Sequence, residues 1–280
     1  MTARQIENMR RFAVPAIGAV LFAFTYVTAV LTSRGQRLEN DALSAATVPH
    51  GEPLVLAFVS VPDLFFGLVA VVTIALVRRR KDAALRAFLV LALSNLATQL
   101  FKYRLLSRPN LSDLLKDNTF PSGHTTAYLS VMLAFLFVVP TRFRPAVSVF
   151  GAVVTAAAAV ELMNYGWHRL SDIVGAVLLV LTIASLAVAI IRPSSVSAPS
   201  ERQSAIGASR ISVRILVIAG IAALLFGAAF TIVSRLADGS RDRLLLVGTE
   251  GFAAAAVCAA FLAMGWVLAR PEIRLVPAQR

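Results

Sequence analysis

The stretch DIVGAVLLVLTIASLAVAII, residues 172–191, decides the fold class of this chain. After Asp172, only Thr182 and Ser185 place polar side chains in an otherwise small or apolar run. A helix of about 20 such residues crosses the hydrocarbon core of a bilayer. It also satisfies its own backbone hydrogen bonds where water is absent. The segment therefore predicts a membrane-spanning helix.

Seven further apolar runs lie on either side of this segment. Of the 280 residues, 58% are hydrophobic and 15% are charged, whereas soluble domains carry about 25% charge. The further runs are residues 12–32, 54–77, 83–101, 122–139, 146–163, 211–233 and 244–269. The sequence therefore predicts an all-α, polytopic membrane protein and excludes soluble enzymes and disordered chains. The single cysteine, Cys258, excludes an intramolecular disulfide.

The second run, residues 54–77, is interrupted by Pro62 and Asp63. One interpretation is a single kinked helix. The other places residues 54–61 at the membrane interface and starts the span near Pro62, since proline suits the first position of a helix. We favour the second interpretation because it brings Asp63 towards water.

The distribution of basic residues predicts the orientation. Most of the 27 Lys and Arg residues fall in segments on the amino-terminal side of the membrane. By the positive-inside rule, both termini are expected in the cytoplasm of a multi-pass cell-membrane protein. The net charge of +12 is concentrated in short loops without interleaved aromatic residues. We therefore expect membrane lipids rather than nucleic acid as partners.

The chain is expected to have two membrane parts. Residues 1–192 are predicted to form a six-helix core. A cytoplasmic Ser/Pro-rich linker, residues 193–210, is predicted to connect it to two additional C-terminal transmembrane helices within residues 211–270. Residues 271–280 are predicted to be a cytoplasmic tail. The sequence leaves the role of the last two helices and the oligomeric state open.

Two of the three histidines, His124 and His168, lie at predicted helix ends on the outer face. Asp172 follows His168 by one helical turn, so the two side chains share a face. The carboxylate can then fix the tautomer of the imidazole and stabilise its protonated form. Such a set suits phosphoryl transfer, in which one imidazole attacks phosphorus and the other protonates the leaving oxygen.

The neighbouring residues suit phosphate binding. Gly123 allows backbone N–H groups to approach an anion closely. The helix that opens at Ser122 presents unpaired N–H groups and the positive end of its dipole. Lys102 and Arg108 add positive charge, and an arginine can hold phosphate oxygens in bidentate fashion.

Together these segments resemble the signature of the type 2 phosphatidic acid phosphatase superfamily, which includes vanadium haloperoxidases. The family pattern is Lys-x6-Arg-Pro, then Pro-Ser-Gly-His, then Ser-Arg-x5-His-x3-Asp. Residues 121–124 match the second motif completely, Arg108-Pro109 match the end of the first, and His168 to Asp172 match the end of the third. The resemblance covers roughly residues 50–192.

The resemblance implies a metal-independent lipid phosphatase without a cofactor. It implies that His168 is the nucleophile that forms a phosphohistidine, that Asp172 orients it and that His124 is the general acid. The implied phosphate-binding residues are Lys102, Arg108, Ser122 and Gly123. With the outward-facing site, it implies a lipid phosphate or diphosphate of the polyprenyl diphosphate, phosphatidate or phosphatidylglycerol phosphate class as substrate.

The sequence departs from the pattern at two places. Lys102 precedes Arg108 with one residue fewer between them, and the Ser-Arg of the third motif is replaced by Glu161-Leu162. Arg169 and Arg104 are both candidates for the missing guanidinium group. The missing arginine also motivates an alternative, a non-catalytic or transport-type membrane protein that binds phospholipid on the same fold.

Four other side chains need an interpretation. Glu161 either supports the site or forms hydrogen bonds within the bundle. His50 is expected in an exposed loop, and Tyr165 and Trp167 are expected in the aromatic belt at the membrane interface.

Overall fold

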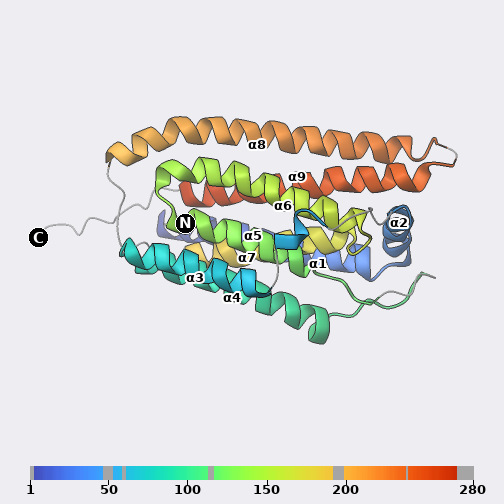
Figure 1. Cartoon of the computed structure of the whole chain (residues 1–280), viewed down its shortest axis with the longest axis horizontal. Helices are drawn as coiled ribbons and strands as arrows, with labels where there is room; N and C mark the ends of the chain where they lie inside the picture. The colour runs from blue at the N-terminus through green and yellow to red at the C-terminus, as the bar shows by residue number, and fades with distance from the viewer. Residues whose placement is uncertain are drawn as a thin grey trace, which may run out of the picture.

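The computed structural model describes residues 3–46, 53–58, 61–112, 117–191, 199–237 and 239–269. Over these residues the chain forms helices and no strand. The long helices lie side by side along the longest axis of the molecule, and one short helix, α2, lies across one end (Figure 1). The all-α, polytopic prediction is therefore confirmed.

Each predicted apolar run corresponds to one helix of the bundle. The helices are α1 (Ala3–Thr25), α2 (Ser33–Ser44), α3 (Val61–Val77), α4 (Lys81–Leu100), α5 (Gly123–Val138), α6 (Arg144–Asn164), α7 (Leu170–Ile190), α8 (Pro199–Val233) and α9 (Arg241–Ala269). Among the described residues, six helices are long and apolar enough to cross a membrane, and the apolar parts of α3 and α5 are shorter. Turns of π-helix extend α1 over Tyr26–Val30 and α4 over Phe101–Leu105.

The second apolar run divides as the favoured interpretation expected. Leu56–Phe58 form a turn of 3-10 helix, and α3 begins at Val61 with Pro62 in its first turn. The side chain of Asp63 lies outside the described residues.

Helix α2 has no counterpart among the predicted helices, because its sequence is polar and the predicted helices are apolar runs. Its N-cap is Thr32, whose side chain accepts a hydrogen bond from the N–H of Gly35 at 3.0 Å. Gly35 packs so closely on the preceding π turn that a Cβ atom there would lie 2.3 Å from the carbonyl oxygen of Thr28. This contact fixes a polar helix at the end of the bundle.

The two C-terminal helices pack on the first six. In α9, Val257, Phe261 and Met264 belong to the same buried cluster as Leu133 of α5 and Val180 of α7. Helix α8 packs along α9 at the edge of the bundle (Figure 1). It begins at Pro199, so it includes part of the predicted linker; nothing in residues 199–210 breaks a helix after that proline.

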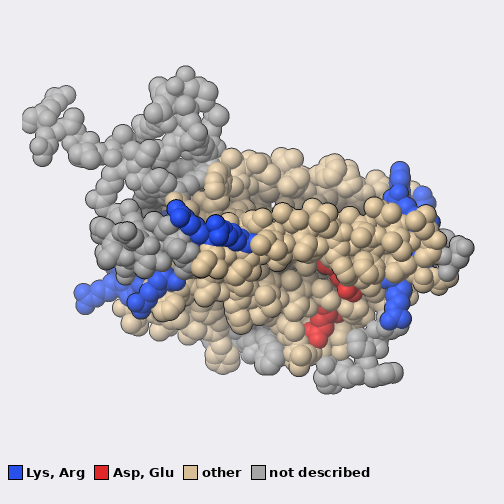
Figure 2. Space-filling model, turned by 90° about the horizontal axis from the view of Figure 1, so that it is seen from above, with Lys and Arg blue, Asp and Glu red and all other residues tan. Residues whose placement is uncertain are grey.

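Charged side chains are distributed as a membrane protein requires. On the face seen in Figure 2, Lys and Arg side chains lie toward the two ends of the long axis, and the zone between them consists mostly of other residues, with acidic side chains in it nearer one end. Such a zone matches the hydrocarbon layer between two polar interfaces.

Candidate active site

The starts of α5 and α7 bring the two histidines together. His124 lies in the first turn of α5, and His168 lies just before α7. Their ring centroids are 6.5 Å apart, with the rings edge to face. The backbone N–H of Ser122 donates a 2.9 Å hydrogen bond to the carbonyl oxygen of Asp172, which ties the two helix starts to each other.

Asp172 is the centre of this arrangement. It is fully buried, and its Oδ2 lies 3.4 Å from Nδ1 of His168. The same carboxylate accepts hydrogen bonds from the hydroxyl of Thr119 at 2.6 Å and from the backbone N–H of Arg169 at 2.9 Å. A buried carboxylate is stable only with such partners. Because Nδ1 faces Asp172, Nε2 is the nitrogen of His168 that remains for chemistry.

Arg108 extends the cluster from the loop before α5. Its Nη2 donates to Oδ1 of Asp172 at 2.8 Å, and its Nη1 lies 3.7 Å from Oε2 of Glu39. Its Nε and Nη1 are buried and have no hydrogen-bond partner among the described residues. Buried donors without an acceptor are costly, so these two N–H groups suit the oxygens of a bound phosphate.

At the start of α5, Ser122 and Gly123 have different roles. Ser122 is fully buried and caps the helix, since its Oγ accepts from the N–H of Thr125 at 3.3 Å. Its own backbone N–H donates a hydrogen bond to the carbonyl oxygen of Asp172. The N–H groups of Gly123 and His124 have no acceptor within the helix. A Cβ at Gly123 would meet only the side chain of Gln99, at 3.8 Å, so the approach to these amides is open.

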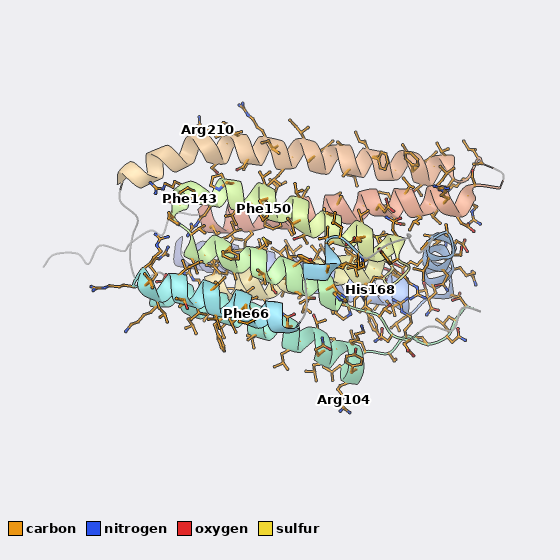
Figure 3. All side chains as sticks on the ribbon, in the orientation of Figure 1. Phe66, Arg104, Phe143, Phe150, His168 and Arg210 are labelled. Atoms are coloured by element: carbon orange, nitrogen blue, oxygen red, sulfur yellow. The ribbon has the colours of Figure 1, made fainter. Side chains whose placement is uncertain are left out.

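The three other basic candidates differ in their position relative to the site. Lys102 lies in the π turn after α4, close enough to interact electrostatically with His124. Arg104 is exposed and points away from the bundle, whereas His168 lies among the helices (Figure 3). Arg169 is buried, and it donates from Nε to Oδ1 of Asn40 at 2.9 Å and from Nη1 to Oγ1 of Thr119 at 3.4 Å. Of the two arginines proposed to replace the missing one, Arg169 therefore lies in the site.

Helix α2 contributes residues that the sequence analysis missed. The carboxylate of Glu39 accepts hydrogen bonds from the N–H and the hydroxyl of Ser171, at 2.7 and 2.8 Å. Burial raises the pKa of Glu39 to about 7; the negative charge of Asp172 adds to the rise and Arg108 opposes it. Glu39 and Asn40 fall one turn after Gln36 in a polar segment, and that spacing is the signal that could have revealed them.

Gln36 holds the loop that carries Arg108. Its side-chain amide donates to the carbonyl oxygen of Pro109 at 2.6 Å and accepts from the N–H of Leu111 at 3.2 Å. Asn40 donates to the hydroxyl of Ser112 at 2.6 Å. Helix α2 thus fixes both Arg169 and the loop of Arg108.

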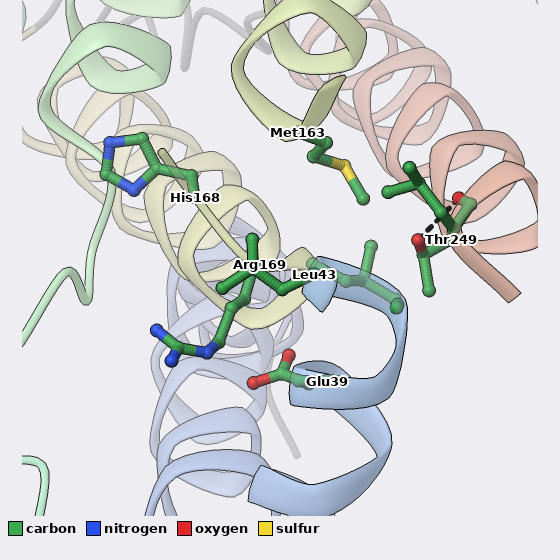
Figure 4. A pocket seen from close by; sticks show the side chains of 9 residues that line it. Glu39, Leu43, Met163, His168, Arg169 and Thr249 are labelled. Carbon is green, nitrogen blue, oxygen red and sulfur yellow. Dashed lines mark hydrogen bonds between the residues drawn. The ribbon is translucent and has the colours of Figure 1, made fainter. Parts of the chain in front are cut away.

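A hollow lies beside His168, between α2, the end of α6, the start of α7 and α9. In Figure 4 the side chains of His168 and Arg169 point to one side, and Leu43, Met163 and Thr249 stand on the other. Helix α9 therefore borders the site. The lining residues are Glu39, Ala42, Leu43, Met163, His168, Arg169, Leu170, Leu246 and Thr249.

The remaining candidates lie around the site. Glu161 accepts hydrogen bonds from the N–H groups of Leu54, Val55 and Leu56 at 2.5, 2.9 and 2.8 Å, so it anchors the segment before α3. Trp167 is half exposed, with its ring centroid 6.0 Å from that of His124. His50 lies outside the described residues. Within the described part of the chain, no three His, Cys, Asp or Glu side chains form a group that could hold a metal ion.

Part of the chain matches the model of a known protein family. Residues 83–195 match the family model of the PAP2 superfamily. Every site residue predicted from the sequence lies within that range. No curated protein and no solved structure matches the chain significantly. Residues 83–195 of this multi-pass helical membrane protein are therefore similar to the PAP2 superfamily, and this similarity suggests a phosphatase that acts on phosphate esters.

Proposed function

We propose that this protein is a lipid phosphatase that works through a phosphohistidine on His168. The observation that carries the proposal is the buried cluster of His168, Asp172 and Arg108, with His124 across from it. This cluster supplies a positioned nucleophile, its orienting carboxylate, unpaired donors for phosphate oxygens and a second imidazole. We propose residues 1–192 as its catalytic core.

The first step is displacement at phosphorus. Nε2 of His168 forms a bond to phosphorus while the bond to the lipid oxygen breaks, and Asp172 stabilises the positive charge that develops on the ring. His124, in its protonated form, gives its proton to the leaving oxygen. In the second step, neutral His124 takes a proton from water, which attacks the phosphohistidine, releases phosphate and restores both rings.

We propose that the phosphate binds to donors that have no hydrogen-bond acceptor among the described residues. We assign its oxygens to Nε and Nη1 of Arg108 and to the first N–H groups of α5, at Gly123 and His124. Lys102 adds positive charge. Ser122 acts through the cap that orients these amides. We assign the place of the missing third-motif arginine to Arg169.

A lipid substrate is supported by the surroundings of the site. Exposed apolar side chains near it, at Tyr103, Leu105 and Trp167, are typical of the level where headgroups meet hydrocarbon. A polyprenyl diphosphate, phosphatidate or phosphatidylglycerol phosphate can keep its tail in the bilayer while its phosphate reaches the histidines.

We place the site at the outer face of the cell membrane, with both termini in the cytoplasm, as the distribution of basic residues predicts. Ser44 in α2 is exposed, and the native Cys258 is buried. A membrane-impermeant maleimide should therefore label Ser44→Cys in intact cells and leave the unmodified chain unlabelled. Labelling of Ser44→Cys only after permeabilisation would reverse the orientation.

The catalytic proposal is tested with the purified protein in detergent. We expect phosphate release from at least one of the three lipid classes, unchanged by EDTA. We expect the native protein, when it is stopped during turnover, to carry a radioactive phosphate and His168→Ala to show none. Arg104→Ala is the matched control with full activity, because Arg104 points away from the site. Lipid binding without release and without a labelled histidine would establish the non-catalytic alternative, and inactivation by EDTA would disprove metal independence.

A further inference from the structure

A cluster of arginines lies at the end of the bundle opposite the histidines. The turn between α3 and α4 and the start of α6 bring together Arg78, Arg80, Arg86 and Arg144, with Asp82 among them. Helix α6 runs from Arg144 to Asn164, and at 1.5 Å per residue its ends are about 30 Å apart. In Figure 3, Phe143, next to Arg144, lies toward one end of the bundle, and His168 lies toward the other. The cluster is therefore distinct from the catalytic site.

Three of the arginines have partners that fix them in place. Arg78 donates to the carbonyl oxygen of Val138, the last residue of α5, at 2.9 Å. Arg86 donates to the carbonyl oxygen of Ile191, just after α7. Arg80 forms an ion pair of 3.4 Å with Asp82. Cations at helix C-termini are stabilising.

Arg144 is the exception. Its Nε is buried, and its side chain forms no hydrogen bond or ion pair with any residue that the structure describes. The positive charges of Arg80, Arg86 and Arg78 act on it, and Asp82 alone opposes them. A partly buried cation without a counter-ion is strongly unfavourable. The described part of the chain therefore supplies no anion that pairs directly with Arg144.

The structure also indicates what kind of anion fits. Arg78, Arg80 and Arg86 lie close enough for their charges to act on Arg144, and arginine binds phosphate oxygens in bidentate fashion. Exposed apolar side chains at Leu76, Val77 and Phe143 lie on the same turns. A soluble anion makes no favourable contact with these apolar side chains, whereas the acyl chains of a lipid can cover them.

We propose that Arg78, Arg80, Arg86 and Arg144 form a phosphate-binding site for the headgroup of an anionic phospholipid, which is bound and not hydrolysed. Its phosphodiester supplies the counter-ion of Arg144, and its chains lie against Val77 and Phe143. This site does not depend on the catalytic proposal.

The test is thermal unfolding of the full-length protein in nanodiscs, followed by tryptophan fluorescence. Nanodiscs of phosphatidylcholine are compared with nanodiscs that also contain phosphatidylglycerol. We expect phosphatidylglycerol to raise the unfolding temperature of the native protein and of Arg142→Met, the exposed neighbour that serves as the control. We expect Arg144→Met to lose most of this shift, and Arg144→Lys, which keeps the charge without the planar fork, to keep part of it.

A second readout separates the possible counter-ions. In phosphatidylcholine alone, Arg144→Met should be at least as stable as the native protein, because it removes an unpaired charge. If it is clearly less stable, Arg144 already pairs with an acidic residue of the chain and the proposal fails. An unchanged response of Arg144→Met to phosphatidylglycerol would also overturn it. If inorganic phosphate alone reproduces the Arg144-dependent shift, the ligand is free phosphate and the lipid assignment is wrong.

Discussion

Arg108 and Asp172 form a buried ion pair, with Nη2 and Oδ1 2.8 Å apart and side-chain exposures of 4% and 0%. The pair joins the loop before α5 to the first turn of α7. Because Asp172 also holds Nδ1 of His168, the residue assigned to phosphate binding and the proposed nucleophile share one carboxylate. A phosphate bound by Arg108 is thereby placed next to His168.

The first prediction concerns Asp172. Asp172→Asn keeps the size of the side chain and removes the charge that stabilises the His168 imidazolium and pairs with Arg108. We expect kcat to fall by about 10²-fold or more, measured as phosphate release from the best lipid substrate. Asp41→Asn is the control, since Asp41 pairs only with the exposed Arg241. Equal activity of Asp172→Asn and the native protein would remove Asp172 from the mechanism.

The second prediction concerns the pH dependence of stability through Glu39. Its pKa is about 7 in the folded protein against 4.5 in the unfolded chain, chiefly because of burial. Below pH 4.5 both states are protonated, and Glu39 makes no difference. Between pH 4.5 and 7 the unfolded chain releases its proton first, so stability falls as pH rises. Above pH 7 the penalty is constant, at up to about 3 kcal/mol.

Glu39→Gln removes this titration. We therefore expect the free energy of unfolding of the native protein to decline relative to Glu39→Gln as pH rises from 4.5 to 7. Parallel pH profiles for the two proteins in detergent would contradict a buried, titrating Glu39.

The third prediction separates Arg169 from Arg104. Arg169→Lys keeps a positive charge but loses the fork that joins Asn40 and Thr119, so we expect a lower kcat/KM, by about 10-fold or more. Arg104→Lys should match the native kinetics. Asn40→Ala, which removes one partner of Arg169, should reduce kcat/KM in the same direction by less. If Arg169→Lys has the kcat/KM of the native protein, Arg169 does not replace the arginine that is missing from the third motif.

The fourth prediction concerns the packing of α8 on α9. A Cβ at Gly251 would lie 2.7 Å from the carbonyl oxygen of Ala223 and 2.8 Å from the backbone nitrogen of Gly227. Small residues allow such close approach between membrane helices. We expect Gly251→Ala to lower the unfolding free energy by about 1–3 kcal/mol. Gly265→Ala, where a Cβ meets nothing within 4 Å, should not destabilise, and equal stability of the two variants would contradict this packing.

The fold class, and several local contacts of the candidate site, could be predicted from the amino-acid sequence alone. Apolar runs of sufficient length predict helices wherever they occur, because the bilayer leaves the backbone no other partner. The one-turn spacing of His168 and Asp172 and the helix start at Ser122 are equally local, and they predicted the contacts found between these residues. Local patterns suffice where the interacting groups are neighbours in the chain.

The distant residues that complete the candidate site could be identified only from the three-dimensional packing of the helices. Arg169 and Arg104 are equivalent in the sequence analysis, but Asn40, far away in the chain, holds Arg169 in the site. Glu39 could be placed beside Ser171 and Arg108 only once α2 was seen to lie across the end of the bundle. These contacts depend on how polar segments pack between the helices, and their hydrogen-bond partners are not specified by hydrophobic pattern or by short-range spacing.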